Sequence, residues 1–317
     1  MGPLAILGGG AALLGGGLAV FSGLTARRIE AAVPKDGEVI EAEGHRLHIA
    51  QAGDGPPILL IHGLAGQMRN FHRDMVDDLV RDYRVIRVDR PGSGYSPRGA
   101  DASARLPAQA EAMAALIRTL GLKTPLVVGH SLGGALALTL ALDHPELVGG
   151  LALIAPLSQA QDIADVPPVF HPLIIRSPAL RRAVAWTLAT PAGMVRAHKA
   201  LTEIFAPEPV PADFGTAGGG LLAMRPGGFH ASSSDLVALE GDLGPMAARL
   251  GSLDLPVAIL YGRDDNLLDY RLHGETSAGQ IKSGRIELVD GGHMLPFTQP
   301  VRSARFVRDA AERLWPK

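Results

Sequence analysis

Short apolar runs alternate with amphipathic stretches along most of the chain, and this alternation predicts its elements. Alternating polar and apolar positions at 38–44 and 45–53 predict two strands joined at Gly44. Continuous apolar runs, which suit strands buried on both faces, follow at 56–63, 84–90, 125–130, 148–156, 255–265 and 284–292. Helical patterns separate them, at about 68–80, 106–122, 132–145, 271–280 and 298–315. Strands that alternate with helices predict an α/β protein with a mostly parallel sheet, flanked by helices on both faces.

The alternation stops between residues 157 and 251, in a stretch rich in proline and glycine that contains only short helical pieces. We interpret this stretch as an insertion over the carboxyl edge of the sheet, where ligands bind in such folds. The insertion would divide one domain into a first part, 38–156, and a second part, 252–317.

Residues 1–30 form a distinct hydrophobic segment, because no charged side chain occurs before Arg27. As a helix, residues 1–26 would be about 39 Å long, which is enough to span a bilayer. We therefore expect a membrane anchor through residues 3–25, with Arg27 and Arg28 keeping the catalytic domain on the cytoplasmic side. The alternative is a cleaved signal peptide, which would make the protein secreted or periplasmic.

Composition narrows the range of functions. The 317 residues contain no cysteine, which excludes disulfides, thiol catalysis and thiolate metal sites. The net charge of −2 and the 4% of aromatic residues give no sign of a nucleic-acid partner. No His, Asp or Glu cluster has metal-ligand spacing, so the sequence predicts neither a metal nor another cofactor.

The stretch "VVGHSLGG" places Ser131 where the predicted strand 125–130 turns into the predicted helix 132–145. A serine in so sharp a turn takes a strained backbone conformation, and its neighbours two residues away approach each other closely. Glycine is needed there, and the sequence has Gly129 and Gly133. A G-x-S-x-G pattern between a buried strand and a helix of small residues is typical of a nucleophilic serine.

A serine hydroxyl needs a base, and a histidine that follows the last predicted strand on a glycine-rich loop, His293, is one candidate. His273, the other late histidine, lies in a polar helical stretch. The base in turn needs a carboxylate, and Asp264 and Asp265 both follow the preceding strand directly.

The segments "IHGLAG", "VDRPGSGYS", "GHSLGG", "YGRDD" and "GGHMLP" together resemble the α/β-hydrolase fold, over about residues 38–315. The resemblance implies an eight-stranded sheet with a helical cap insertion, and a serine hydrolase of the esterase or lipase kind. It implies Ser131 as nucleophile, His293 as base and Asp265 as acid, with Asp264 as the alternative acid. No cofactor is implied.

The same resemblance implies an oxyanion hole made by the backbone N–H groups of Leu64 and Leu132, the residue after the nucleophile. We interpret the neighbouring His62 and His130 as structural. The glycine-rich segment 89–96 lacks the pattern of a phosphate loop, and we interpret it as a turn that shapes one wall of the site.

The predicted function is cleavage of a carboxylic ester through an acyl-enzyme. Alternatives are hydrolysis of a lactone, an amide or a carbon–carbon bond, perhydrolysis, and a non-catalytic binding protein on the same fold. The apolar runs 166–175 and 180–188, with Trp186 and Phe205 as bulky neighbours, predict an apolar pocket and a small apolar ester as substrate.

Overall fold

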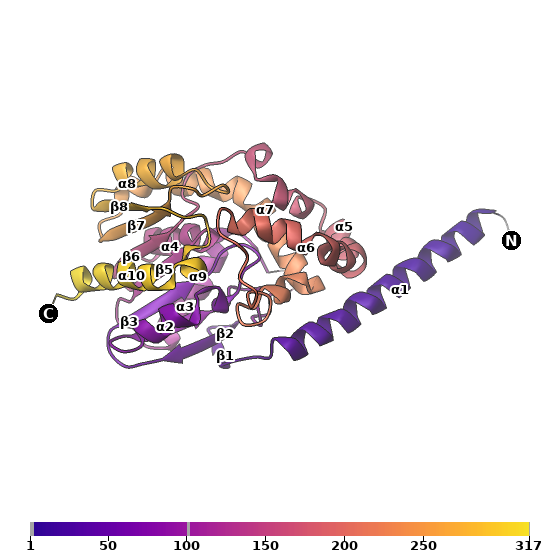
Figure 1. The fold of residues 1–317 in the computed structure, drawn as a ribbon, viewed down its shortest axis with the longest axis horizontal. Helices are drawn as coiled ribbons and strands as arrows, with labels where there is room; N and C mark the ends of the chain where they lie inside the picture. Colours follow the sequence, from indigo (N-terminus) through magenta and orange to yellow (C-terminus); the bar gives the residue numbers. More distant parts are fainter. Residues whose placement is uncertain (1–2, 100–101, 317) are drawn as a thin grey trace.

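The computed structural model describes residues 3–99 and 102–316, and an eight-stranded sheet forms its centre (Figure 1). The strands are β1 (Glu38–Ala42), β2 (His45–Ala52), β3 (Pro57–Ile61), β4 (Arg84–Val88), β5 (Leu126–His130), β6 (Gly150–Ile154), β7 (Val257–Gly262) and β8 (Gly284–Val289). They lie in the order β1-β2-β4-β3-β5-β6-β7-β8. The pairs β1–β2 and β2–β4 are antiparallel, and the other neighbouring pairs are parallel. The predicted mostly parallel sheet of eight strands is therefore confirmed.

Helices cover both faces of the sheet, which explains why its central strands are apolar throughout. Side chains of successive strand residues point to opposite faces, and in β3 they enter two different clusters. Leu59 and Ile61 pack with helices α3 (Leu106–Thr119) and α4 (Leu132–Asp143), whereas Ile58 and Leu60 pack on the other face. That second face is covered by α2 (Arg73–Leu79) and α10 (Pro300–Leu314).

Between β6 and β7 the chain leaves the sheet as the segment 157–251. This segment contains α5 (Pro178–Val184), α6 (Thr190–Phe205) and α7 (Pro226–Ala247), joined by the short turns η3 (Ile163–Asp165), η4 (Pro168–Leu173), η5 (Ala185–Ala189) and η6 (Gly220–Met224). Helix α7 returns toward the sheet, because its leucines at 236, 239 and 243 join the apolar cluster of α3 and α4.

The remaining short elements are η1 (Met68–Asn70), η2 (Pro145–Leu147), η7 (Leu250–Ser252), η8 (Arg271–Thr276), α8 (Ser277–Gln280) and α9 (Leu295–Thr298).

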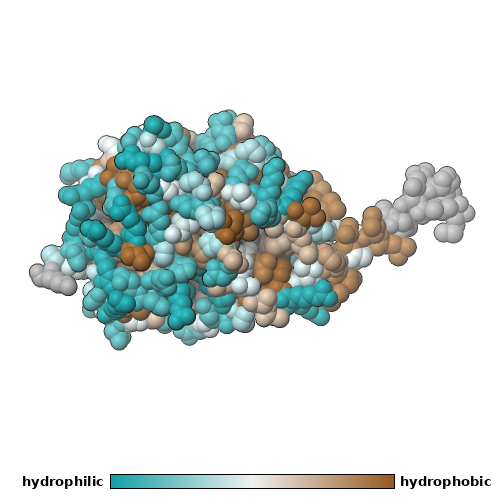
Figure 2. Space-filling view, in the orientation of Figure 1, coloured by the Kyte–Doolittle hydropathy of each residue, from teal (hydrophilic) through white to brown (hydrophobic). Residues whose placement is uncertain are grey.

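Helix α1 (Pro3–Ala32) extends away from the body of the molecule as one continuous helix (Figure 1). Its last turns contact α6, α7, η5 and η6, and there Ser22, Thr25 and Ile29 are buried at helical spacing. Leu13 and Val20 remain exposed, and apolar side chains are visible along the projecting part of the helix in Figure 2.

The predicted membrane anchor at residues 3–25 is wrong, and so is the membrane-anchored location that rested on it. Within the part of the chain that the structure describes, no helix combines the length and the hydropathy needed to cross a bilayer. Two physical reasons stand out. Glycine dilutes the apolar content of the segment, and α1 continues through Arg27 and Arg28 to an end that is docked on the protein's own segment 157–251.

Candidate active site

Ser131 stands in the sharp turn between β5 and α4, with backbone angles φ 55° and ψ −121°. A positive φ is strained for a residue with a side chain, so the surroundings must hold it. The backbone N–H of Ser131 donates to the carbonyl oxygen of Ile154 at 3.1 Å, and its own carbonyl oxygen accepts the N–H of Leu157 at 3.0 Å. Strand β6 and the residues directly after it therefore fix the strained conformation.

Glycines make this turn possible, because three segments of backbone meet there. A Cβ atom on Gly129 would lie 2.7 Å from the carbonyl carbon of Gly133. A Cβ atom on Gly133 would lie 2.8 Å from the carbonyl carbon of Ile61, at the end of β3. No side chain fits at either position, since real Cβ atoms do not approach backbone so closely.

His293 and Asp265 form a buried pair, with His293 Nδ1 2.7 Å from Asp265 Oδ2. The other carboxylate oxygen accepts the N–H groups of Leu267 and Leu268 at 2.9 and 3.0 Å. Burial by itself raises the pKa of Asp265, but His293 and these two N–H groups outweigh it, so the pKa lies below its usual value. Asp265 is thus an ionised acceptor, and the neutral tautomer of His293 that it favours carries its proton on Nδ1.

Asp264, the alternative acid, binds the loop backbone and not the imidazole. Its Oδ2 accepts the N–H of Gly291 at 3.0 Å. On the next residue, both carboxylate oxygens of Glu208 lie 3.2 and 3.1 Å from the N–H nitrogen of Gly292. Three successive residues of this loop, 291–293, are therefore each held by a different carboxylate.

Sequence reasoning did not find Glu208. It lies in the proline-rich stretch 206–220 of the segment 157–251, and no local pattern links it to a loop 84 positions later. Its contribution is to tie that segment to the loop that carries His293.

The two neighbouring histidines hold backbone groups of the site. Because a carbonyl oxygen only accepts, His130 donates its Nε2–H to the backbone carbonyl oxygen of His293, at 3.0 Å. His62 Nδ1 lies 2.9 Å from the carbonyl oxygen of Gly63, and its Nε2 accepts the N–H of Arg90 at 3.0 Å. Burial lowers the pKa of His130 to about 3 and the pKa of His62 to about 4, so both rings stay neutral near pH 7.

Arg90 supports the loop that leads to Leu64. Its fully buried guanidinium donates from Nε to the carbonyl oxygen of His62 at 3.1 Å and from Nη2 to that of Gly63 at 3.0 Å. Its Nη1 lies 2.8 Å from Asp235 Oδ2 on α7. The sequence indicated only that the turn 89–96 shapes a wall of the site. Arg90 can support this loop because it is paired with Asp235, and no sequence pattern shows that these two residues lie close together.

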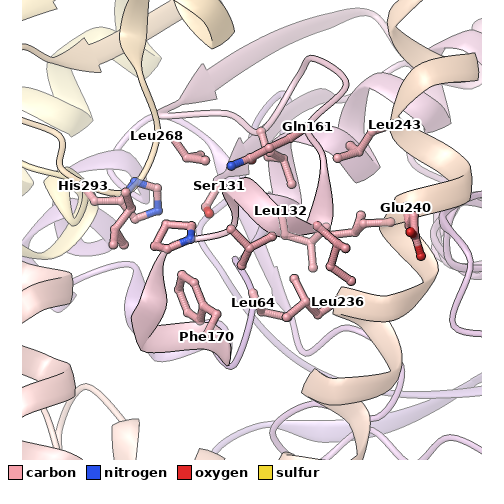
Figure 3. Close-up of a pocket in the computed structure, with 16 residues that line it drawn as sticks. Leu64, Ser131, Leu132, Gln161, Phe170, Leu236, Glu240, Leu243, Leu268 and His293 are labelled. Carbon is pink, nitrogen blue, oxygen red and sulfur yellow. The ribbon is translucent and has the colours of Figure 1, made fainter. Parts of the chain in front are cut away.

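One pocket of about 60 Å³ brings the predicted residues together: Ser131, His293, Leu64 and Leu132 all line it (Figure 3). Most other lining side chains are apolar: Leu157, Ile163, Val166, Pro167, Phe170, Leu236, Leu239, Leu243, Leu267 and Leu268. The polar ones are Gln161 and Glu240, and Figure 3 shows Glu240 on the opposite side of Ser131 from His293.

Trp186 and Phe205, expected beside the apolar pocket, lie elsewhere. The ring of Phe205 packs against that of Phe214, 4.7 Å away between centroids, in a cluster with Met294 and Phe297. Since Met294 follows His293 directly, this cluster supports the histidine loop from the side of the segment 157–251. Trp186 is half exposed and lines a different groove.

The pocket wall thus contains a hydroxyl and an imidazole that a carboxylate orients, and acyl transfer uses both groups. Across residues 3–99 and 102–316, no group of three His, Asp or Glu side chains is placed to hold a metal ion.

Comparison with known proteins establishes the family. A family model described as the alpha/beta hydrolase fold matches residues 56–300. The chain therefore belongs to the alpha/beta hydrolase fold family, a family of hydrolases.

The similar proteins carry names that describe different activities. The chain is 30% identical over 254 residues to the magnesium-chelatase 30 kDa subunit of Rhodobacter capsulatus, covering 76% of this chain and 82% of that protein. It is 27% identical over 271 residues to the proposed carbamate hydrolase RutD of Pseudomonas syringae pv. syringae, covering 83% and 96%. A thermophilic esterase from Thermogutta terrifontis has a similar structure, with a TM-score of 0.71 and 21% identity over 88% of this chain and 99% of that one. At that identity the likeness concerns the fold alone.

Gly133, two residues after Ser131, offers a stability test. Gly133→Ala should lower the free energy of unfolding by about 3 kcal/mol, because its methyl group would press against backbone that cannot move. The matched control is Gly241→Ala on α7, where no atom lies within 4 Å of the added Cβ. There the change should raise the free energy of unfolding by about 0.5 kcal/mol. Urea denaturation of both variants measures the difference, and equal effects would contradict the proposed crowding at Gly133.

The contact between Glu208 and Gly292 is tested by hydrogen exchange. Glu208→Gln replaces a charged acceptor by a neutral one, so the amide of Gly292 should exchange about tenfold faster. Glu203→Gln, the same change on α6, is the control and should leave this exchange unaltered. An unchanged rate at Gly292 in the Glu208 variant would show that the contact does not hold the loop.

Proposed function

We propose that the protein hydrolyses a carboxylic ester through an acyl-enzyme. Ser131 is the nucleophile, His293 the general base and acid, and Asp265 the carboxylate that orients the imidazole. The observation that carries the proposal is the 2.7 Å hydrogen bond between His293 and Asp265 in the wall of the pocket that Ser131 lines.

The reaction would proceed in two halves. The Oγ atom of Ser131 forms a bond to the ester carbonyl carbon while its proton passes to Nε2 of His293. The negative oxygen that develops lies near the backbone N–H groups of Leu64 and Leu132. The C–O bond to the alcohol then breaks, and the imidazolium returns the proton to the departing oxygen. Water repeats these steps on the acyl-enzyme and releases the acid.

We further propose that the segment 157–251 acts as the cap that selects the substrate, with the core formed by 38–156 and 252–317. Its residues Val166, Phe170, Leu236 and Leu239 supply much of the apolar pocket lining. The small volume of about 60 Å³ favours a short apolar acyl group.

Other acyl derivatives remain alternatives, because the same residues would serve an amide, a lactone, a carbon–carbon bond or a perhydrolysis reaction. The relative from Pseudomonas syringae, named for carbamate hydrolysis, supports the wider class of acyl substrates.

A second candidate is a role as a subunit of a magnesium chelatase. It is favoured by the 30% identity over 254 residues to the Rhodobacter capsulatus protein that carries this name. Co-purification of the other chelatase subunits with the tagged chain, together with absent ester turnover, would favour this candidate over the first.

Active-site labelling tests the nucleophile and its partners. A fluorophosphonate probe should label the native chain, and Ser131→Ala should abolish both labelling and p-nitrophenyl acetate turnover. Asp265→Asn should lower kcat by about 10⁴-fold, because the imidazole loses its correct tautomer. Asp264→Asn is the matched control and should have a much smaller effect, because Asp264 binds the backbone N–H of Gly291 and not the imidazole. Labelling that survives in Ser131→Ala would overturn the assignment of the nucleophile.

An acyl-length series tests the pocket. Among p-nitrophenyl esters from acetate to decanoate, kcat/KM should be highest for chains of up to about four carbons, since the cavity holds only a few water-sized groups. Leu243→Ala should extend the accepted chain length by enlarging the apolar wall. A preference for charged or strongly polar acids would contradict an apolar acyl site.

A further inference from the structure

A second concave site lies on the other side of α7 from the pocket of Ser131. It is a groove of about 1300 Å³ between α1, the loop 92–99, α5 and α7. Residues 236, 239, 240 and 243 of α7 line the pocket, whereas residues 230, 231, 234, 237 and 238 line the groove. Both sets follow helical spacing, so α7 is a wall shared by two cavities.

The groove is strongly basic. Its lining includes four arginines: Arg98, Arg181, Arg182 and Arg225. Two carboxylates offset part of this charge. Glu30 pairs with Arg225, and Asp235 is shared by Arg98 and the buried Arg90. These seven side chains carry a surplus of three positive charges.

Arg181 is buried, yet its partners are all neutral. Its guanidinium donates to the hydroxyl groups of Ser233 and Ser234 at 3.0 and 2.9 Å and to the carbonyl oxygen of Ile175 at 2.7 Å. Burial and the charge of Arg98 lower the pKa of Arg181. These contacts fix the orientation of the guanidinium, while the charge of Asp235 acts in the opposite direction and offsets part of its positive charge. A fixed guanidinium whose hydrogen bonds go to neutral groups is suited to bind an anion.

Arg98 carries an unused donor. Its side chain is 9% exposed, and within the described part of the chain its Nη1 atom is buried without a hydrogen-bond partner. A buried N–H of a charged group left unpaired is costly, so a rotation of the Arg98 side chain that gave Nη1 an acceptor in the groove would be favourable. The positive potential extends to His230, whose pKa is lowered by burial and by Arg181, Arg182 and Arg98.

The groove also offers space and an apolar surface. No atom lies within 4 Å of the position a Cβ on Gly227 would occupy, in the first turn of α7. The ring of Trp186, 49% exposed, lines the side formed by α5, η5 and α1. An anionic group could thus bind the arginines while the rest of the molecule lies against Trp186.

We propose that this groove binds an organic oxyanion, a carboxylate or a phosphate monoester carried on an aromatic or apolar body. The guanidinium groups of Arg98 and Arg181 bind the oxyanion, Arg182 adds charge at the open side, and Trp186 contacts the body. The site is distinct from the pocket of Ser131, and the inference does not depend on hydrolysis there.

Calorimetric titration of the full chain with phenyl phosphate and with benzoate tests the proposal. At least one of the two should bind with one site per chain, and more tightly than inorganic phosphate. Arg182→Glu should weaken that binding at least about tenfold. The matched control is Arg196→Glu, the same charge reversal at an exposed position of α6 outside the groove, and it should leave binding unchanged. Equal weakening by both variants would mean that only net charge matters, which overturns the site.

A second substitution and a fluorescence titration test the same site independently of the calorimetry. Gly227→Glu places a carboxylate in the groove at a position with free space, so it should abolish binding without loss of thermal stability. The chain has two tryptophans, so Trp315→Phe leaves Trp186 as the single emitter. Its fluorescence should change on titration and saturate at the calorimetric stoichiometry. Heat of binding without a response from Trp186, or binding that survives Gly227→Glu, would place the ligand elsewhere and overturn the proposal.

Discussion

The hydrogen bond between Asp265 and His293 is the contact on which the organisation of the site depends. The two residues follow β7 and β8, which are parallel neighbours, so their loops leave the sheet at the same edge. The loops are in close contact, because a Cβ on Gly262 would collide with the backbone of Gly291 and Gly292. This crowding leaves the imidazole little freedom. The pair therefore holds the imidazole in the wall of the pocket that Ser131 also lines.

The segment 157–251 does more than line the pocket, because it also holds two loops of the candidate site in place. Glu208 binds the histidine loop at Gly292, and Asp235 on α7 holds the arginine that supports the backbone before Leu64. Both ends of the candidate site are thus tied to a part of the chain that lies outside the sheet. Movement of this segment would consequently disturb His293 and the loop of Leu64 at once, rather than only opening the pocket.

Sequence patterns predicted those features that arise from neighbouring residues. The apolar runs predicted the strands, and the glycines around Ser131 predicted a tight turn because the steric reason is local. The patterns could not predict contacts made across the fold. Glu208 meets Gly292, and Arg90 meets Asp235, only after the chain has folded. Trp186 and Phe205 show the same limit: apolar composition indicates burial, but it does not say into which cavity a side chain points. For α1, hydrophobicity suggested a bilayer, whereas part of its surface packs on the protein itself.

Asp235 has one oxygen directed at Arg90 and the other at Arg98. The carboxylate and the first guanidinium are almost wholly buried, so replacing Asp235 would leave both arginines without their common acceptor in a region of low dielectric. Through this one carboxylate the backbone before Leu64 is mechanically connected to the basic groove, so a displacement at one of them would be transmitted to the other.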